Sequence, residues 1–365
     1  MIKSFSLTLS LFFFLIAKHQ IYYDIIGSNN YRIDFKLQIA AIFFLILSTF
    51  PFKKLNNDTF IIFFLAILHF LINLFILSYD NIYEFINFFF IILSFPISYF
   101  IASSFNLLRI IKFYFFILFL LLFLSFFFGD ITTSYYGDFR KYRYIFGFLK
   151  PTFLSEAMLL LFFFVNTLSA NQKKFFFIFI NFLCITLIFL SGSRSGLACI
   201  LLFLYLNFEK QLNINKKIII KLFIRSFIII FLIFYAFFEF NFDNLNLISS
   251  NRIEIIIADF RGNINTPLVF LFGNMNAENI FLSYQREGFL YHIDNFYAER
   301  FIVTGLFGCL TILYAVFSLH KNLQEKGKIY LYVILFYGLF ENSIFNLTSF
   351  FSVFSIIITL SYLKR

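Results

Sequence analysis

Long apolar runs separated by short polar breaks make up almost the whole sequence. A helix that crosses a membrane needs roughly 17–25 mostly apolar residues, and twelve runs approach that length. The pattern therefore predicts an all-α polytopic integral membrane protein, with residues 1–365 in a single transmembrane domain. The predicted spans lie near residues 4–22, 36–51, 59–78, 84–102, 110–129, 152–170, 174–191, 195–208, 222–238, 298–319, 329–343 and 345–363.

The last two of these spans have an alternative. The apolar stretch from Ile329 to Leu363 is interrupted only at Glu341 and Asn342. It is long enough for two tight spans, or for one span followed by a re-entrant segment. About twelve helices are therefore expected, and both arrangements of this stretch stay open.

The composition excludes a water-soluble enzyme. Of all residues, 61% are hydrophobic and only 13% are charged, and the mean hydropathy is +0.88, whereas about a quarter of the residues in an ordinary soluble domain are charged. The three cysteines lie within apolar runs and the four histidines are scattered, which argues against a metal or disulfide site. No phosphate-binding loop or dinucleotide fingerprint occurs, so no cofactor is expected.

The charged residues divide by type between the two sides of the predicted membrane. Fourteen of the eighteen lysines lie on one side, and because lysine-rich short loops face the cytoplasm, the N-terminus is predicted to be cytoplasmic. The net charge of +10 then indicates a membrane surface rather than nucleic acid. Eight of the eleven arginines fall on the opposite, outer side: Arg32, Arg140, Arg143, Arg194, Arg252, Arg261, Arg286 and Arg300.

This arginine distribution favours an outward-facing anion site. The planar guanidinium binds carboxylate or phosphate oxygens with two parallel hydrogen bonds, which an ammonium does not. The alternative is that some of these arginines only pair with neighbouring acids. Two outer segments exceed the length of a turn, residues 130–151 and the large loop 239–297.

Two short motifs carry candidate chemistry. In SGSRSG, residues 191–196, Arg194 stands in a tight outer turn, which suits either a phosphate cradle or a simple helix break with a snorkelling arginine. In HIDNFYAER, residues 292–300, His292 titrates near neutrality, and Asp294 or Asn295 is placed to orient its ring. The alternative for His292 is a solvated loop histidine. Within the spans, His69 is expected to be neutral and hydrogen-bonded between helices.

Five segments in the C-terminal two-thirds of the chain are the basis of a resemblance to a known family. They are YRYIFGFLKPTFLSEAMLLL at 142–161, LSGSRSGLACILL at 190–202, NRIEIIIADF at 251–260, VFLFGN at 269–274 and HIDNFYAERFIVTGLFGCL at 292–310. In this order they resemble the polysaccharide polymerase and O-antigen ligase superfamily of bacterial inner membranes, and in particular its Wzy-type polymerases. One departure is Asn274, which stands where the family has a second glycine.

The resemblance implies metal-independent glycosyl transfer in the periplasmic leaflet of the inner membrane. The donor is a glycan on undecaprenyl pyrophosphate and the acceptor is a lipid-linked repeat unit. The resemblance also adds a chain-length regulator protein as a partner to consider. It implies that Arg194, Arg252 and Arg143 bind the pyrophosphate and that His292, with Asp294 or Asn295, acts on the acceptor hydroxyl.

Two other functions stay open. An O-antigen ligase shares the fold and the donor but transfers the glycan to lipid A-core. A flippase for the lipid-linked unit is less favoured, because we find neither the internal repeat nor the charge within the spans that such a transporter is expected to have.

Overall fold

The computed structural model describes sixteen stretches of the chain, and all structural statements below concern these residues. They are 2–21, 33–49, 57–75, 82–105, 107–134, 142–168, 174–211, 256, 260, 263–264, 266–274, 285–286, 289–290, 295–341, 344–347 and 349–363.

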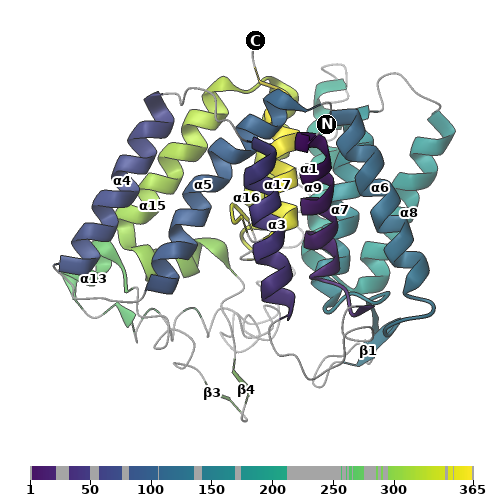
Figure 1. The fold of residues 1–365 in the computed structure, drawn as a ribbon, viewed down its shortest axis with the longest axis horizontal. Helices are drawn as coiled ribbons and strands as arrows, with labels where there is room; N and C mark the ends of the chain where they lie inside the picture. Colours follow the sequence, from purple (N-terminus) through teal and green to yellow (C-terminus); the bar gives the residue numbers. More distant parts are fainter. Residues whose placement is uncertain are drawn as a thin grey trace, which may run out of the picture.

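The described part of the chain is mostly helical, and its helices lie side by side in one bundle (Figure 1). Both termini are at one end of the bundle, which we call the terminal end. Two small antiparallel hairpins and the short helix α13 are at the other, which we call the hairpin end (Figure 1). The helices are α1 Ile2–Ile16, α3 Ile33–Thr49, α4 Asn57–Phe75, α5 Ile82–Ser104, α6 Leu107–Leu124, α7 Pro151–Leu168, α8 Lys174–Ser191, α9 Arg194–Gln211, α13 Pro267–Phe272, α15 Phe296–Asn322, α16 Glu325–Tyr337 and α17 Phe350–Leu360.

The hairpins are short. Strand β1 (Thr132–Ser134) pairs with β2 (Tyr142–Tyr144), and β3 (Gln285–Arg286) pairs with β4 (Phe289–Leu290). The first hairpin lies within the predicted outer segment 130–151. The predicted span 222–238 and most of the predicted loop 239–297 lie outside the described residues.

The predicted all-α fold is confirmed for the described residues. Two of the described helices, Pro151–Leu168 and Phe296–Asn322, are long and apolar enough to cross a membrane, and seven further apolar helical stretches are shorter. Helix α1 ends at Ile16, earlier than the predicted span 4–22. Lys18 to Gln20 form a turn beyond the helix, and His19 in this turn bridges to Phe148.

The stretch from Ile329 to Leu363 forms two short helices, α16 and α17, which contact each other. All eleven residues of α17 are buried. A helix of this length rises about 16 Å, roughly half the thickness of the hydrocarbon core. Helix α17 is therefore a buried central helix, and both arrangements of this stretch stay predictions.

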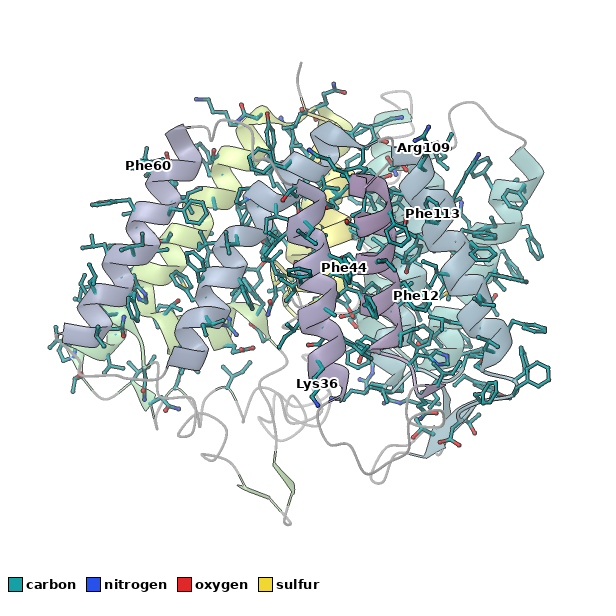
Figure 2. The ribbon with its side chains drawn as sticks, viewed as in Figure 1. Phe12, Lys36, Phe44, Phe60, Arg109 and Phe113 are labelled. Carbon is teal, nitrogen blue, oxygen red and sulfur yellow. The ribbon has the colours of Figure 1, made fainter. Side chains whose placement is uncertain are left out.

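Phenylalanine fills the core and also covers the outside of the bundle. Phe163 packs against the rings of Phe203, Tyr330 and Phe351 in the centre. On the outside, side chains such as Phe60 on α4 remain 68% exposed, and Figure 2 shows Phe60 at the outer edge of its helix. An apolar outer surface of this kind suits hydrocarbon rather than water.

Candidate functional site

The turn between α8 and α9 contains Arg194 and is built by glycine and serine. Gly192 has φ +69°, which ends α8. The Ser193 hydroxyl then accepts a hydrogen bond from the Gly196 amide at 3.2 Å, as the side chain of an N-cap residue does. Arg194 is the first residue of α9 and is exposed. The predicted SGSRSG turn therefore presents its arginine at the hairpin end.

Gly196 brings α9 against α7. A Cβ atom at this position would overlap the Ser155 hydroxyl and lie 2.9 Å from Cγ2 of Ile188. Ser155 is fully buried on the second turn of α7. Only glycine allows this approach, which places the buried polar face of α7 directly beside the arginine turn.

A buried carboxylate closes this cluster. The Ser195 hydroxyl donates a hydrogen bond to Oε1 of Glu341 at 3.2 Å, and the hydroxyl oxygens of Ser193 and Ser195 are 3.1 Å apart. Glu341 is 9% exposed. The arginine turn is thus tied, through serine hydroxyls, to the segment that follows α16. We call residues 338–341 the linker segment.

A second buried acid, Glu156, accompanies Glu341. Glu156 on α7 is 3% exposed, and both carboxylates interact electrostatically with the fully buried Tyr337. The expectation that the spans carry no charge is therefore wrong at Glu156, inside the predicted span 152–170, and at Glu341, inside the predicted span 329–343. The long apolar context hid Glu156, because one acid barely changes the mean hydropathy of such a run.

The linker segment also holds the start of α15. Asn295 caps this helix, since its Oδ1 accepts from the Ala298 amide at 2.9 Å. Its Nδ2 donates to the Leu339 carbonyl at 2.8 Å, and the Phe296 amide donates to the Gly338 carbonyl at 2.9 Å. The linker segment therefore connects two motifs that are a hundred residues apart in sequence.

The structure brings some of the predicted site residues together. Ser195, the neighbour of Arg194 in the turn, and Asn295 are both hydrogen-bonded to the linker segment. Arg143 lies on β2, opposite Thr133, and this strand contacts α8, the helix that leads into the arginine turn. His292, Asp294 and Arg252 lie outside the described residues.

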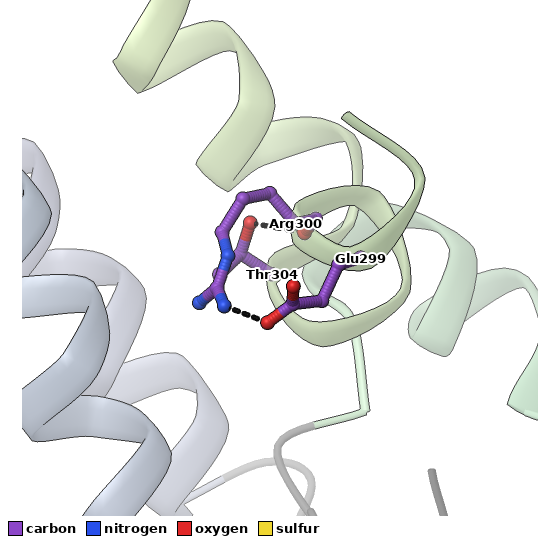
Figure 3. A network of polar contacts seen from close by, with 3 residues as sticks. All are labelled: Glu299, Arg300 and Thr304. Atoms are coloured by element: carbon purple, nitrogen blue, oxygen red, sulfur yellow. Dashed lines mark hydrogen bonds and ion pairs between the residues drawn. The ribbon is translucent and has the colours of Figure 1, made fainter. Parts of the chain in front are cut away.

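Arg300 has a different environment from the one predicted. It was grouped with the outward-facing arginines, but it is 5% exposed within α15. Its guanidinium forms an ion pair with the adjacent Glu299, and the Thr304 hydroxyl donates to the Arg300 carbonyl at 2.7 Å (Figure 3). At this position the alternative interpretation, an arginine paired with a neighbouring acid, is confirmed.

Glu156 and Glu341 are the residues that the sequence analysis missed. Glu341 was noticed only as a break in an apolar stretch, although an acid in such a context is by default a functional candidate. That signal was sufficient to select it. Its partner Ser195 was not predictable, because 146 residues separate the two.

The chemistry available at this cluster is that of an arginine beside buried hydroxyls and carboxylates. Among the described residues, no group of three or more His, Cys, Asp or Glu side chains is arranged to hold a metal ion. An exposed arginine at a helix start can bind an oxyanion, while Glu341 holds the turn that presents it through the Ser195 hydroxyl.

No protein-family model and no curated protein matches the chain.

Proposed function

We propose that this chain polymerises undecaprenyl-pyrophosphate-linked oligosaccharide repeat units into O-antigen or capsular polysaccharide, as the resemblance to Wzy-type polymerases implies. The observation that supports this most is the linker segment, which binds the turn of Arg194 through Glu341 and the start of α15 through the Leu339 carbonyl. These two motifs carry the proposed pyrophosphate site and the proposed catalytic segment.

The proposal places the chain in the bacterial inner membrane with about twelve spans. The N-terminus and the terminal end are cytoplasmic, and the hairpin end is periplasmic. The exposed phenylalanines around the bundle support contact with lipid. The lysine distribution along the sequence supports the orientation.

In the proposed reaction, a hydroxyl of the acceptor sugar attacks the anomeric carbon of the donor glycan. A new C–O bond forms, and the bond from the anomeric carbon to the pyrophosphate breaks. The pyrophosphate leaves with the electron pair, and Arg194, assisted by Arg252 and Arg143, stabilises its charge. His292 takes the proton of the attacking hydroxyl.

The contacts of Asn295 refine the proposed roles. Both ends of its amide are engaged, Oδ1 by the cap of α15 and Nδ2 by the Leu339 carbonyl. These contacts support a role for Asn295 in holding the catalytic segment in place, and we propose Asp294 as the residue that orients the His292 ring.

The test is a lengthening assay with the purified chain in liposomes and lipid-linked repeat units. We expect longer glycans without added core lipid, and a loss of roughly a hundredfold or more in rate for Arg194→Ala and for His292→Ala. Arg109→Ala is the matched control, because Arg109 is an exposed arginine at the terminal end, and it should keep full activity.

Other outcomes of this assay contradict the proposal in different ways. Transfer that occurs only with core lipid identifies a ligase. Movement of the lipid-linked unit across the bilayer without lengthening identifies a flippase. Full lengthening by both the Arg194 and the His292 variants shows that the site assignment is wrong.

A further inference from the structure

His69 lies in the middle of α4 and is fully buried. Its Nε2 is 2.8 Å from the Thr304 carbonyl oxygen and 3.0 Å from the Phe272 carbonyl oxygen. Because a carbonyl oxygen can only accept, Nε2 carries the hydrogen and shares it between the two carbonyls. The Asn73 amide nitrogen, 3.4 Å from Nε2, also donates to the Phe272 carbonyl at 3.3 Å. The expectation of a histidine hydrogen-bonded between helices is confirmed, and the partners lie on α15 and α13.

Both carbonyls that His69 binds belong to helix ends. Phe272 is the last residue of α13. Thr304 precedes Gly305, whose φ of 62° and ψ of −169° interrupt α15. Carbonyls at a helix end or break lack their usual amide partners. The buried N–H of His69 therefore supplies a hydrogen bond to a carbonyl at such a site in each helix.

Gly305 and Gly273 allow these helix ends to cross closely. A Cβ on Gly305 would lie 2.6 Å from the Leu271 carbonyl oxygen, and a Cβ on Gly273 would lie 2.5 Å from the Thr304 amide. The Asn274 amide also donates to the Ile302 carbonyl at 2.8 Å. The crossing of α13 and α15 is therefore a contact between main chains, and the His69 side chain bonds to a carbonyl of each helix.

The break divides α15, and its first part, residues 296–304, is held at both ends. At its start Asn295 and Phe296 bond to the linker segment. At its far end the Thr304 carbonyl bonds to His69. The proposed catalytic residues His292 and Asp294 directly precede this half-helix in sequence.

We propose that His69 is a positioning residue, which sets the orientation of the half-helix 296–304 and of its cap residue Asn295. This inference rests on the proposed function for its effect on activity, but not for its effect on the half-helix. His69 touches no substrate. It acts by fixing the Thr304 end of the half-helix, opposite the cap residue Asn295.

The test compares His69→Gln with His69→Asn in the purified full-length protein. The glutamine amide nitrogen reaches about as far as Nε2 of histidine, whereas the asparagine amide is shorter and does not reach both carbonyls. Hydrogen–deuterium exchange of residues 296–304 is measured first, because it requires no activity. We expect faster exchange there in His69→Asn and near-normal exchange in His69→Gln.

The lengthening assay gives the second measurement. We expect kcat to fall roughly tenfold to a hundredfold in His69→Asn, with KM nearly unchanged, and to recover in His69→Gln, because small displacements of reacting groups cost rate more than binding. The control is His320→Asn, whose histidine bonds to the exposed hydroxyl of Tyr332 at the terminal end. It should change neither measurement.

Three results overturn the inference: normal exchange of 296–304 in His69→Asn, faster exchange spread evenly over all helices, or no recovery in His69→Gln. If the wild-type chain does not lengthen glycans, the proposed function fails. The exchange measurement then decides the role of His69 by itself.

Discussion

The arginine turn and the crossing of α13 with α15 are two solutions to the same packing problem. In both, a glycine removes the Cβ that would keep two segments apart, Gly196 against Ser155 and Gly305 against the backbone of Leu271 and Gly273. The first contact is filled by serine hydroxyls and the Glu341 carboxylate. The second is filled by main-chain groups and one imidazole. Polar side chains, which can change rotamer, therefore fill the first contact. The second contact depends on the main-chain conformation of α13 and α15.

This difference predicts unequal tolerance to substitution, and Gly305→Ala should have the largest effect. The φ and ψ of Gly305 lie in a region that is essentially confined to glycine, at a cost of about 1–3 kcal/mol for other residues. Overpacking against Leu271 and Gly273 adds about 1–3 kcal/mol. We expect about 3 kcal/mol or more to be lost from the free energy of unfolding, measured by denaturant titration in detergent.

Gly338→Ala is the matched control for this substitution. Gly338 has an ordinary helical φ of −62°, and a new Cβ would press mainly on the flexible end of the Ile344 side chain. We expect a loss of only about 1 kcal/mol. Equal losses in the two variants would contradict the distinction between a backbone contact and a side-chain contact.

Glu341→Leu tests the side-chain contact and should have an intermediate effect. The substitution removes the buried carboxylate to which the Ser195 hydroxyl donates, which costs about 1–3 kcal/mol. Glu341→Gln keeps an acceptor oxygen and should lose less. Thermal unfolding of both variants, alone and combined with Ser195→Ala, measures the coupling. Strictly additive losses would show that the Ser195–Glu341 bond contributes nothing.

The same contrast explains which features could be predicted from the sequence. The helices followed from apolar runs, and the SGSRSG turn followed from glycine and serine with an arginine between them. The crossing at Gly305 was not predictable, because GLFG within an apolar run reads as continuous helix and main-chain contacts leave no pattern of residue types. Likewise, the bond between Asn295 and Leu339 depends on a carbonyl that every residue has.

At a third glycine contact, the main chain of Gly147 packs against the polar side chain of His19. Because His19 can be protonated, this contact can be tested by measuring stability as a function of pH. Gly147 has φ +74°, and a Cβ there would lie 2.5 Å from Cε1 of His19. The His19 Nδ1 accepts from the Ile21 amide at 3.1 Å. His19 lies in the turn beyond α1, and burial lowers its pKa from 6.5 to about 4.

The lowered pKa means that the unfolded chain binds a proton to His19 more readily than the folded chain does. The stability that neutral His19 contributes is therefore fully present above about pH 6.5 and is lost as the pH falls through about 4. We expect the wild-type protein to lose roughly 1–2 kcal/mol more than His19→Asn between about pH 7 and about pH 5. The asparagine Oδ1 lies about where Nδ1 of histidine lies, so it retains an acceptor for the Ile21 amide but does not titrate. Parallel pH profiles of unfolding would show that the ring protonates without leaving its contact with Gly147. In that case His19 would behave like the polar side chains of the arginine turn, which adjust to the contact that they fill. Main-chain packing alone would then distinguish the crossing at Gly305 from the other two glycine contacts.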